Sequence, residues 1–181
     1  KNNLIFFDFL PSKNLPVSEI KHIPFNFGNV AFVITVDKKI KRNLGESGYP
    51  ARRKSCEKSL PLLSQLLNRE INSLREISIK EFENNKINLL NLDKTMTKRV
   101  EHIVYENQRV LDSVTALKRG DLNHFGRLLN ESGNSALNLY ELDEKTPELT
   151  FLVNNAATVE GTIGVRNMGG GFSANILALV Q

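Results

Sequence analysis

Hydrophobic and polar positions along the chain follow two different periods. Residues 3–9 and 30–36 are short segments rich in Phe, Ile and Val and are bounded by turn-forming residues, which is typical of β-strands. Residues 162–166 and 176–180 have the same character and flank the loop 167–171. We expect four strands, and we expect the first two to belong to one sheet.

Between the two pairs of strands, apolar residues recur every three or four positions, as they do in amphipathic helices. One helix is expected to begin near Pro50, and Pro61 should bend or interrupt it. A short helix is expected at 78–86, and the longest at about 96–118. A further apolar stripe follows within 122–129.

Capping residues mark the ends of these helices. Asp93 or Thr95 can cap the long helix, Gly120 can end it in a left-handed conformation, and Asp121 can cap the next one. Pro147 then indicates the first turn of another helix. Strands at both ends with helices between them favour an α+β fold, in which a helical layer covers one face of an antiparallel sheet.

Composition narrows the class of protein. The chain has 181 residues, of which 40% are hydrophobic, so it can form a core, and no apolar stretch is long enough to span a membrane. A single cysteine, Cys56, excludes an internal disulfide framework and a multi-cysteine zinc site. We therefore expect a cytoplasmic protein that does not bind membranes.

Positive charge is concentrated in one segment. The formal net charge is +4, whereas residues 38–58 alone carry an excess of six positive charges. A nucleic-acid-binding protein would more often have a broad basic surface, so a local anion such as a phosphate is favoured over nucleic acid. A solvated helix start explains the basic segment equally well.

Two short segments of the sequence contain residues that could bind a ligand. Tyr49 precedes a proline and is followed by Arg52 and Arg53, so this helix entrance could offer a phenolic hydroxyl and bidentate anion donors, or it could be an ordinary surface turn. The glycines at 169–171 could form a tight hairpin or cradle a phosphate, although neither the P-loop nor the dinucleotide-binding pattern is matched.

The long helix carries His102 and Glu106 four positions apart. This spacing suits a metal pair or, with Arg99 and Arg109, a ladder of ion pairs. No third ligand stands out, so the ladder is favoured. Cys56 lies on an apolar helix face and is predicted to be a small buried residue and not a nucleophile.

Four ordered segments together resemble the C-terminal half of galactokinases, members of the GHMP small-molecule kinase superfamily. They are 41–57, which includes SGYPARRKSCE; 99–110, RVEHIVYENQRV; 117–132, LKRGDLNHFGRLLNES; and 164–172, GVRNMGGGF. The last is similar to the third GHMP motif. The resemblance implies a ferredoxin-like GHMP C-terminal domain at 30–181, stopping before the family's final helix and strand, with 1–29 as a strand and linker carried over from the N-terminal half.

The resemblance also implies a function. It implies ATP-dependent transfer of the γ-phosphate to the anomeric hydroxyl of galactose or a related sugar, assisted by Mg²⁺. The family's sugar-contacting tyrosine falls on Tyr49, its nucleotide-loop glycines fall on Gly169, Gly170 and Gly171, and Lys41 takes the place of a basic residue near the nucleotide. The catalytic residues of the family belong to the other half, so this chain alone should not catalyse, and no metal ligand is assigned within it.

Departures from the family pattern leave the substrate open. The family's E-S-H becomes Glu131-Ser132-Gly133, and the second glycine pair of its G-G-G-F-G-G-C run is replaced. A relative acting on arabinose or galacturonate is an alternative, and so is a noncatalytic sugar or ATP sensor built on the same fold. We expect Tyr49 and the 169–171 loop to lie together at one edge, facing the N-terminal half. The parent is expected to be a monomer and this chain to self-associate through exposed apolar surface.

Overall fold

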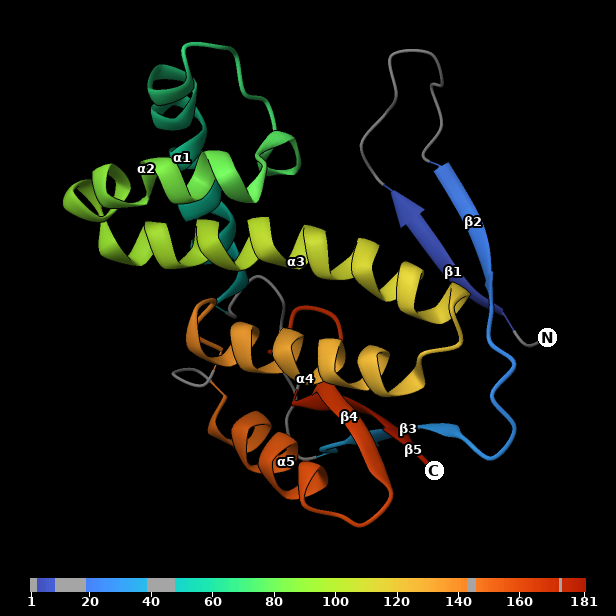
Figure 1. The fold of residues 1–181 in the computed structure, drawn as a ribbon. Coiled ribbons are helices and arrows are strands. Elements are labelled where there is room, and N and C mark those ends of the chain that lie inside the picture. The colour runs from blue at the N-terminus through green and yellow to red at the C-terminus, as the bar shows by residue number, and fades with distance from the viewer. Residues whose placement is uncertain (1–2, 9–18, 39–47, 143–145, 173) are drawn as a thin grey trace.

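A computed structural model describes residues 3–8, 19–38, 48–142, 146–172 and 174–181 (Figure 1). Its elements in chain order are β1 (Asn3–Asp8), β2 (Glu19–Pro24), β3 (Ala31–Val36), α1 (Tyr49–Leu67), the 3₁₀ turn η1 (Leu74–Glu76), α2 (Ile79–Leu92), α3 (Lys94–Lys118), α4 (Leu122–Asn138), α5 (Pro147–Ala157), β4 (Thr162–Asn167) and β5 (Asn175–Val180). The expected order of strands, helices and strands is confirmed.

The strands form two separate antiparallel sheets. β3, β5 and β4 make a three-stranded sheet in that order, with β5 in the centre, while β1 pairs with β2 along all six residues. The prediction that 3–9 and 30–36 share a sheet is therefore wrong. β2 was not predicted because its sequence, EIKHIP, mixes charged and apolar residues, yet its place close behind β1 lets the two pair locally.

Helices cover the three-stranded sheet. Both α4 and α5 pack against β4, and α3 crosses the molecule between α4 and the layer formed by α1 and α2 (Figure 1). This confirms the α+β class with a helical layer on an antiparallel sheet. Close approach of α4 to β4 depends on glycine: a Cβ on Gly126 would lie 2.6 Å from the carbonyl oxygen of Ile163.

The predicted helix signals are confirmed at three positions. The Asp93 carboxylate accepts a hydrogen bond from the Met96 amide at 2.9 Å, and Asp121 does the same for the His124 amide at 2.9 Å. Gly120 is left-handed, with φ +73°. Each of these residues satisfies or terminates a helix end as the sequence indicated.

The predicted interruption at Pro61 is wrong, because α1 continues through it to Leu67. Proline removes one backbone hydrogen bond, but its neighbours Leu60 and Leu63 pack into the apolar cluster that α1 shares with α2 and α3. Leu63 is completely buried. Tertiary packing therefore keeps the helix continuous where its local sequence opposes it.

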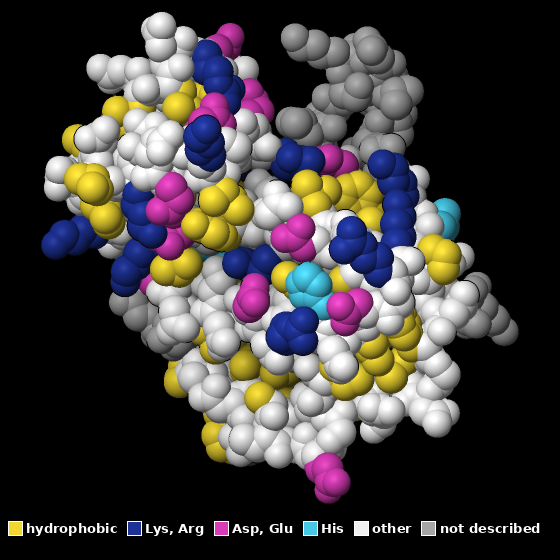
Figure 2. Space-filling view, viewed as in Figure 1, with side chains coloured by type: hydrophobic (Ala, Val, Ile, Leu, Met, Phe, Trp, Pro, Cys, Tyr) yellow, Lys and Arg dark blue, Asp and Glu magenta, His cyan; other side chains and the backbone are white. Residues whose placement is uncertain are grey.

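Three buried clusters make up the core. The first joins the end of α4 with α5, β4 and β5. The second joins α1, η1, α2 and the first half of α3. The third joins β2, the end of α3, α4 and β5. The β1–β2 hairpin enters the third cluster through Ile23. Among the described residues no helix has the length and hydrophobicity needed to cross a bilayer. The face in Figure 2 mixes charged side chains of both signs over α3 and α4 and has no continuous basic surface.

Candidate sugar and nucleotide site

Tyr49 and the glycine loop lie side by side, as the sequence analysis expected. Tyr49 begins α1, and its Cδ2 lies 3.6 Å from the position that a Cβ on Gly170 would occupy. The glycine loop connects β4 to β5 at the end of the sheet. Segments about 120 positions apart in the sequence thus meet at one edge of the fold.

The start of α1 is fixed directly on this loop. A Cβ on Gly48, the residue that precedes α1, would come within 2.8 Å of the Phe172 ring. Only glycine allows the helix start to pack this closely on the aromatic residue that follows the glycine loop. Pro50 in the first turn then sets the backbone direction of α1.

The glycine loop is a hairpin connection in which two of the three glycines are left-handed. Gly169 has φ +55° and Gly171 has φ +78°. The Met168 amide donates to the Asn175 carbonyl at 2.8 Å, and the Gly171 amide donates to the Met168 carbonyl at 3.2 Å. The hairpin interpretation is confirmed. Gly169 and Gly170 remain exposed, so the same backbone is open to a ligand.

A buried asparagine supports the loop from below. The Asn167 side chain donates from Nδ2 to the Gly169 carbonyl at 3.2 Å, and its Oδ1 is buried without a partner. A Cβ on Gly171 would lie 3.4 Å from the same Nδ2 and 3.3 Å from Leu149. The loop therefore rests on α5 and on its own strand. Sequence analysis missed Asn167, since an asparagine before a glycine run is also an ordinary turn residue.

Arg52 is buried and uses its guanidinium to bind backbone carbonyl groups. Its side chain is 3% exposed, and it donates to the Tyr140 carbonyl at 3.1 Å and to the Glu141 carbonyl. Its guanidinium also stands 5.4 Å from the centre of the Phe172 ring. Of the two alternatives left open for this helix entrance, the use of Arg52 as an anion donor is therefore not supported. No local pattern indicated its true role, because its partners are 88 and 89 positions away.

Arg53, the next residue, is exposed and pairs with Glu57 at 2.8 Å. This is an i,i+4 ion pair on the surface of α1, of the kind that contributes little to stability. Lys41, the predicted basic residue near the nucleotide, lies outside the described residues.

Behind the loop, Glu106 connects three elements. Its carboxylate pairs with Arg109 at 2.7 Å, pairs with Arg166 of β4 at 3.1 Å, and accepts a hydrogen bond from Ser132 of α4. Burial opposes ionisation, but Arg166, Ser132 and Arg109 together lower the pKa of Glu106 below its usual value. Of the predicted ladder, the ion pair with Arg109 is confirmed, whereas Arg99 pairs with Glu141 at 3.0 Å. Arg166, which was not predicted, ties β4 to the Glu106 carboxylate.

The charges of Glu106, Arg109 and Arg166 all act on the ring of His102, but its hydrogen bond goes to another residue. Its Nδ1 lies 2.9 Å from the Ser135 hydroxyl, and its ring centre lies 4.9 Å from that of Tyr140. Burial lowers its pKa to about 4, so the ring is neutral near pH 7. Within the described part of the chain, no three His, Cys, Asp or Glu side chains gather as a metal site.

Cys56 is a half-buried thiol beside Tyr140. Burial raises the pKa of its thiol to about 11, against a smaller opposite effect of Arg99. A thiol with so high a pKa stays protonated near neutral pH and is a poor nucleophile. This agrees with the prediction that Cys56 has no catalytic role.

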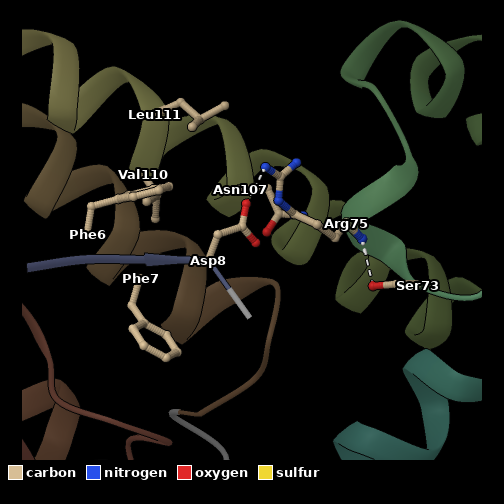
Figure 3. A pocket seen from close by; sticks show the side chains of 8 residues that line it. All are labelled: Phe6, Phe7, Asp8, Ser73, Arg75, Asn107, Val110 and Leu111. Carbon is tan, nitrogen blue, oxygen red and sulfur yellow. Dashed lines mark hydrogen bonds and ion pairs between the residues drawn. The ribbon is translucent and has the colours of Figure 1, made fainter. Parts of the chain in front are cut away.

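Two cavities of about 300 and 310 Å³ lie elsewhere, between the end of β1, residues 73–79 and α3. Phe6, Asp8, Arg75 and Asn107 are among the side chains lining the first (Figure 3), and Arg75 pairs there with Asp8 at 3.0 Å. Neither cavity shares a lining residue with the Tyr49 site.

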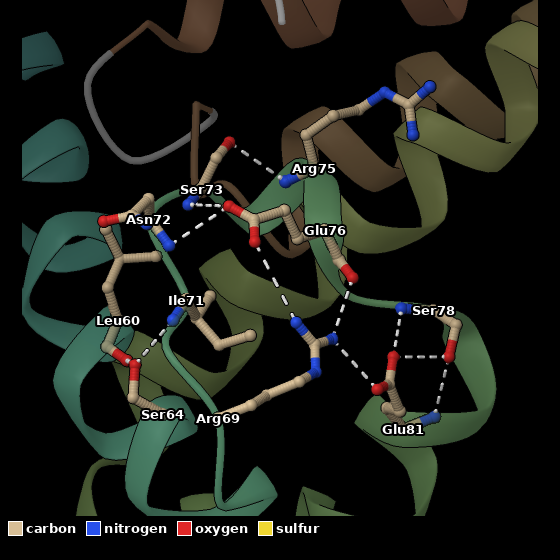
Figure 4. Close-up of polar contacts among 10 residues, drawn as sticks. All are labelled: Leu60, Ser64, Arg69, Ile71, Asn72, Ser73, Arg75, Glu76, Ser78 and Glu81. Carbon is tan, nitrogen blue, oxygen red and sulfur yellow. Dashed lines mark hydrogen bonds and ion pairs between the residues drawn. The ribbon is translucent and has the colours of Figure 1, made fainter. Parts of the chain in front are cut away.

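The rim of these cavities is a turn with many polar side-chain contacts (Figure 4). The Glu76 carboxylate accepts from the Asn72 and Ser73 amides, while Arg69 joins Glu76 to Glu81. Hydrogen bonds from Ser78 and Arg69 lower the pKa of Glu81 to about 2. This turn fixes the connection between α1 and α2.

Comparison with known proteins finds relatives that match about 90% of the chain. No family model matches it. A galactokinase from Clostridium tetani (strain Massachusetts / E88) is 40% identical over 163 residues, which is 90% of this chain and 40% of that protein. A galactokinase from Lacticaseibacillus casei is 38% identical over 161 residues, 89% of this chain and 40% of the relative.

A solved structure agrees with these relatives. The crystal structure of Lactococcus lactis galactokinase complexed with galactose superposes with a TM-score of 0.78 at 34% identity, covering 90% of this chain and 40% of that one. The chain therefore spans about 40% of the length of the relatives it matches. Sequence and fold agree: over about 90% of its length, this chain is similar to part of these galactokinases.

Proposed function

We propose that this chain is the C-terminal part of an ATP-dependent sugar 1-kinase that transfers the γ-phosphate to the anomeric hydroxyl of galactose or a close relative. The observation that carries the proposal is that Tyr49 lies next to Gly170, with its Cδ2 3.6 Å from the position of a Cβ on that glycine. This puts a phenol beside the exposed Gly169 and Gly170 of a partly left-handed loop. Phosphoryl transfer depends mainly on positioning two substrates and neutralising charge. A sugar-facing phenol beside a phosphate-facing backbone supplies the positioning.

In this proposal Tyr49 binds the sugar, while Gly169, Gly170 and Gly171 pack beside the ATP phosphates and Lys41 lies near the nucleotide. The loop fits such a role, because nothing lies within 4 Å of a Cβ position on Gly169, and left-handed glycines let backbone amides approach an anion. Mg²⁺, when bound, would neutralise phosphate charge. Because no cluster of metal-binding side chains lies among the described residues, the nucleotide and groups elsewhere would hold it.

The catalytic residues are proposed to lie outside these 181 residues, in the N-terminal half of the longer protein. The partners of this chain are then that half, a galactose-like sugar and ATP. The expected cytoplasmic location remains a proposal of the same kind.

The experiment is a sugar panel with Mg-ATP on the longer protein, measured as ADP release with galactose, arabinose and galacturonate. We expect turnover with at least one sugar. No turnover on any aldose overturns the kinase proposal, and sugar binding without turnover would identify the noncatalytic sensor.

A paired variant tests the nucleotide loop. Gly170→Ala adds a methyl group at ordinary contact distance from Tyr49 and Phe172, so the fold should tolerate it. We expect it to raise the KM for ATP, because the added methyl group keeps phosphate from the backbone. Gly28→Ala, whose Cβ meets nothing within 4 Å, is the matched control. Equal KM values in both variants would refute the phosphate role of the loop.

A further inference from the structure

Asn167 is a buried polar residue in an apolar part of the core. It is the last residue of β4 and is 4% exposed, and its partner across the sheet, Ile176, is 1% exposed. An apolar side chain of similar size would fill this place without the free-energy cost of burying an amide. A buried polar group of this kind therefore calls for a specific use.

The Asn167 amide is used on the glycine loop. Its Nδ2 donates to the Gly169 carbonyl at 3.2 Å, whereas its Oδ1 is buried and has no partner among the described residues. A carbonyl oxygen only accepts hydrogen bonds, so the side chain must turn its nitrogen toward Gly169. The bond to the loop is thus kept although the other half of the amide stays unpaired.

The backbone of Asn167 is held in place from two sides. Its carbonyl accepts a hydrogen bond from Nε of Arg166 at 3.0 Å, and the Arg166 guanidinium pairs with Glu106 of α3 at 3.1 Å. On the other side, β4 pairs with β5 through the register of Asn167 with Ile176. The side chain therefore acts on the Gly169 carbonyl from a backbone fixed by the helical layer and by the sheet.

Holding the Gly169 carbonyl determines where the next amide points. The peptide bond between Gly169 and Gly170 is trans and planar, so its C=O and N–H groups point in opposite directions. Because the carbonyl is turned toward the buried Asn167, the Gly170 amide is turned away from the core. Backbone amides directed outward from a partly left-handed turn are the donors of an anion site.

We propose that Asn167 is a positioning residue for the nucleotide: it orients the Gly170 amide so that this amide donates to a phosphate of ATP. This role rests on the proposed function and adds to it a residue that does not itself touch the nucleotide. Because the amide already points outward before ATP binds, binding needs no reorientation of the peptide, which favours affinity.

Isothermal titration calorimetry of the longer protein tests this role, because it measures the binding of Mg-ATP and of the sugar separately and without turnover. Asn167→Leu nearly preserves the size of the side chain and removes the bond to Gly169. Thr97→Val is the matched control, since Thr97 is completely buried and its hydroxyl donates to the Asp93 carbonyl at 2.7 Å, at the start of α3. Circular dichroism checks that both variants fold.

We expect Asn167→Leu to raise the dissociation constant for Mg-ATP about fivefold, the effect of one hydrogen bond, and to change that for the sugar less than about twofold. Thr97→Val should change neither constant by more than about twofold. Unchanged Mg-ATP affinity in Asn167→Leu, or equal weakening by Thr97→Val, overturns the positioning role and leaves the proposed function standing. A wild-type protein that does not bind Mg-ATP overturns both.

Nuclear magnetic resonance tests the geometry without any substitution. With glycine selectively labelled with ¹⁵N in the wild-type longer protein, the Gly170 amide signal should shift strongly when Mg-ATP binds, whereas that of Gly120, at the end of α3, should shift little. A Gly170 signal that stays in place while Mg-ATP binds contradicts the proposal, even if Asn167→Leu fails to fold.

Discussion

Replacing Gly126 by alanine tests the contact that holds the helical layer on the sheet. Gly126 lies in α4 directly over β4, and an added Cβ would lie 2.6 Å from the Ile163 carbonyl oxygen and 3.0 Å from its carbon. These atoms belong to the backbone and cannot rotate away. α4 would have to move off β4 by several tenths of an ångström, and β4 leads directly into the glycine loop.

The size of the effect follows from two opposed terms. Overpacking costs about 1–3 kcal/mol, and a rigid backbone contact places this case near the upper value. Alanine favours a helix over glycine by about 1 kcal/mol, which leaves a net loss of about 2 kcal/mol in the free energy of unfolding. For a chain of this length, that loss lowers Tm by about 4–8 °C.

Urea and thermal unfolding, followed by circular dichroism, measure this loss. Gly28→Ala is the control, since its Cβ meets nothing within 4 Å, and its stability should change by no more than about 0.5 kcal/mol. If Gly126→Ala unfolds at the wild-type urea concentration or above it, α4 does not approach β4 as described. The glycine loop would then not be positioned through the packing of α4 on β4.

Three further predictions concern buried groups. Arg52→Met should lower the free energy of unfolding by about 2–4 kcal/mol, because it leaves two backbone carbonyls without donors, whereas Arg53→Met should change it by less than about 0.5 kcal/mol in the same urea assay. His102 has a pKa of about 4 in the folded chain, against 6.5 for the free side chain, so the free energy of unfolding should be highest above pH 6.5 and should fall by about 3 kcal/mol at most as the pH drops toward 4. His102→Gln should flatten this pH dependence. A pKa for His102 near 6.5, measured by NMR, would contradict the prediction. Cys56 should react with a thiol reagent at pH 7.5 far more slowly in the folded chain than in urea, because burial raises its pKa to about 11; equal rates would refute this.

Local signals in the sequence were sufficient for most of the secondary structure. Asp93, Gly120 and Asp121 act within a few residues of themselves, so their capping roles could be predicted from the chain alone. The strand β2 could not, because its alternation is weak and its partner β1 determines its state. Pro61 misled for the same reason, since packing of α1 on its neighbours outweighs a local preference.

The sequence motifs predicted which residues form the site, but they did not predict the buried hydrogen bonds that hold those residues in place. Family resemblance predicted that Tyr49 and the 169–171 loop lie together, and in the structure Tyr49 lies next to Gly170. What holds them there is Arg52 and Asn167, which act through buried bonds to backbone carbonyls. The bonds of Arg52 join residues 88 and 89 positions apart, so no spacing in the sequence encodes them. The bond of Asn167 is local, but an asparagine at this position is equally typical of an ordinary turn.

The central claim is that Tyr49 binds the sugar beside a nucleotide loop, and one measurement tests it most directly. Steady-state kinetics of the longer protein with Tyr49→Phe should show the KM for the preferred sugar raised about tenfold, the loss of one hydrogen bond, with the KM for ATP changed less than about twofold. An unchanged KM for the sugar, or an equal rise for ATP, would contradict the assignment of Tyr49 to the sugar.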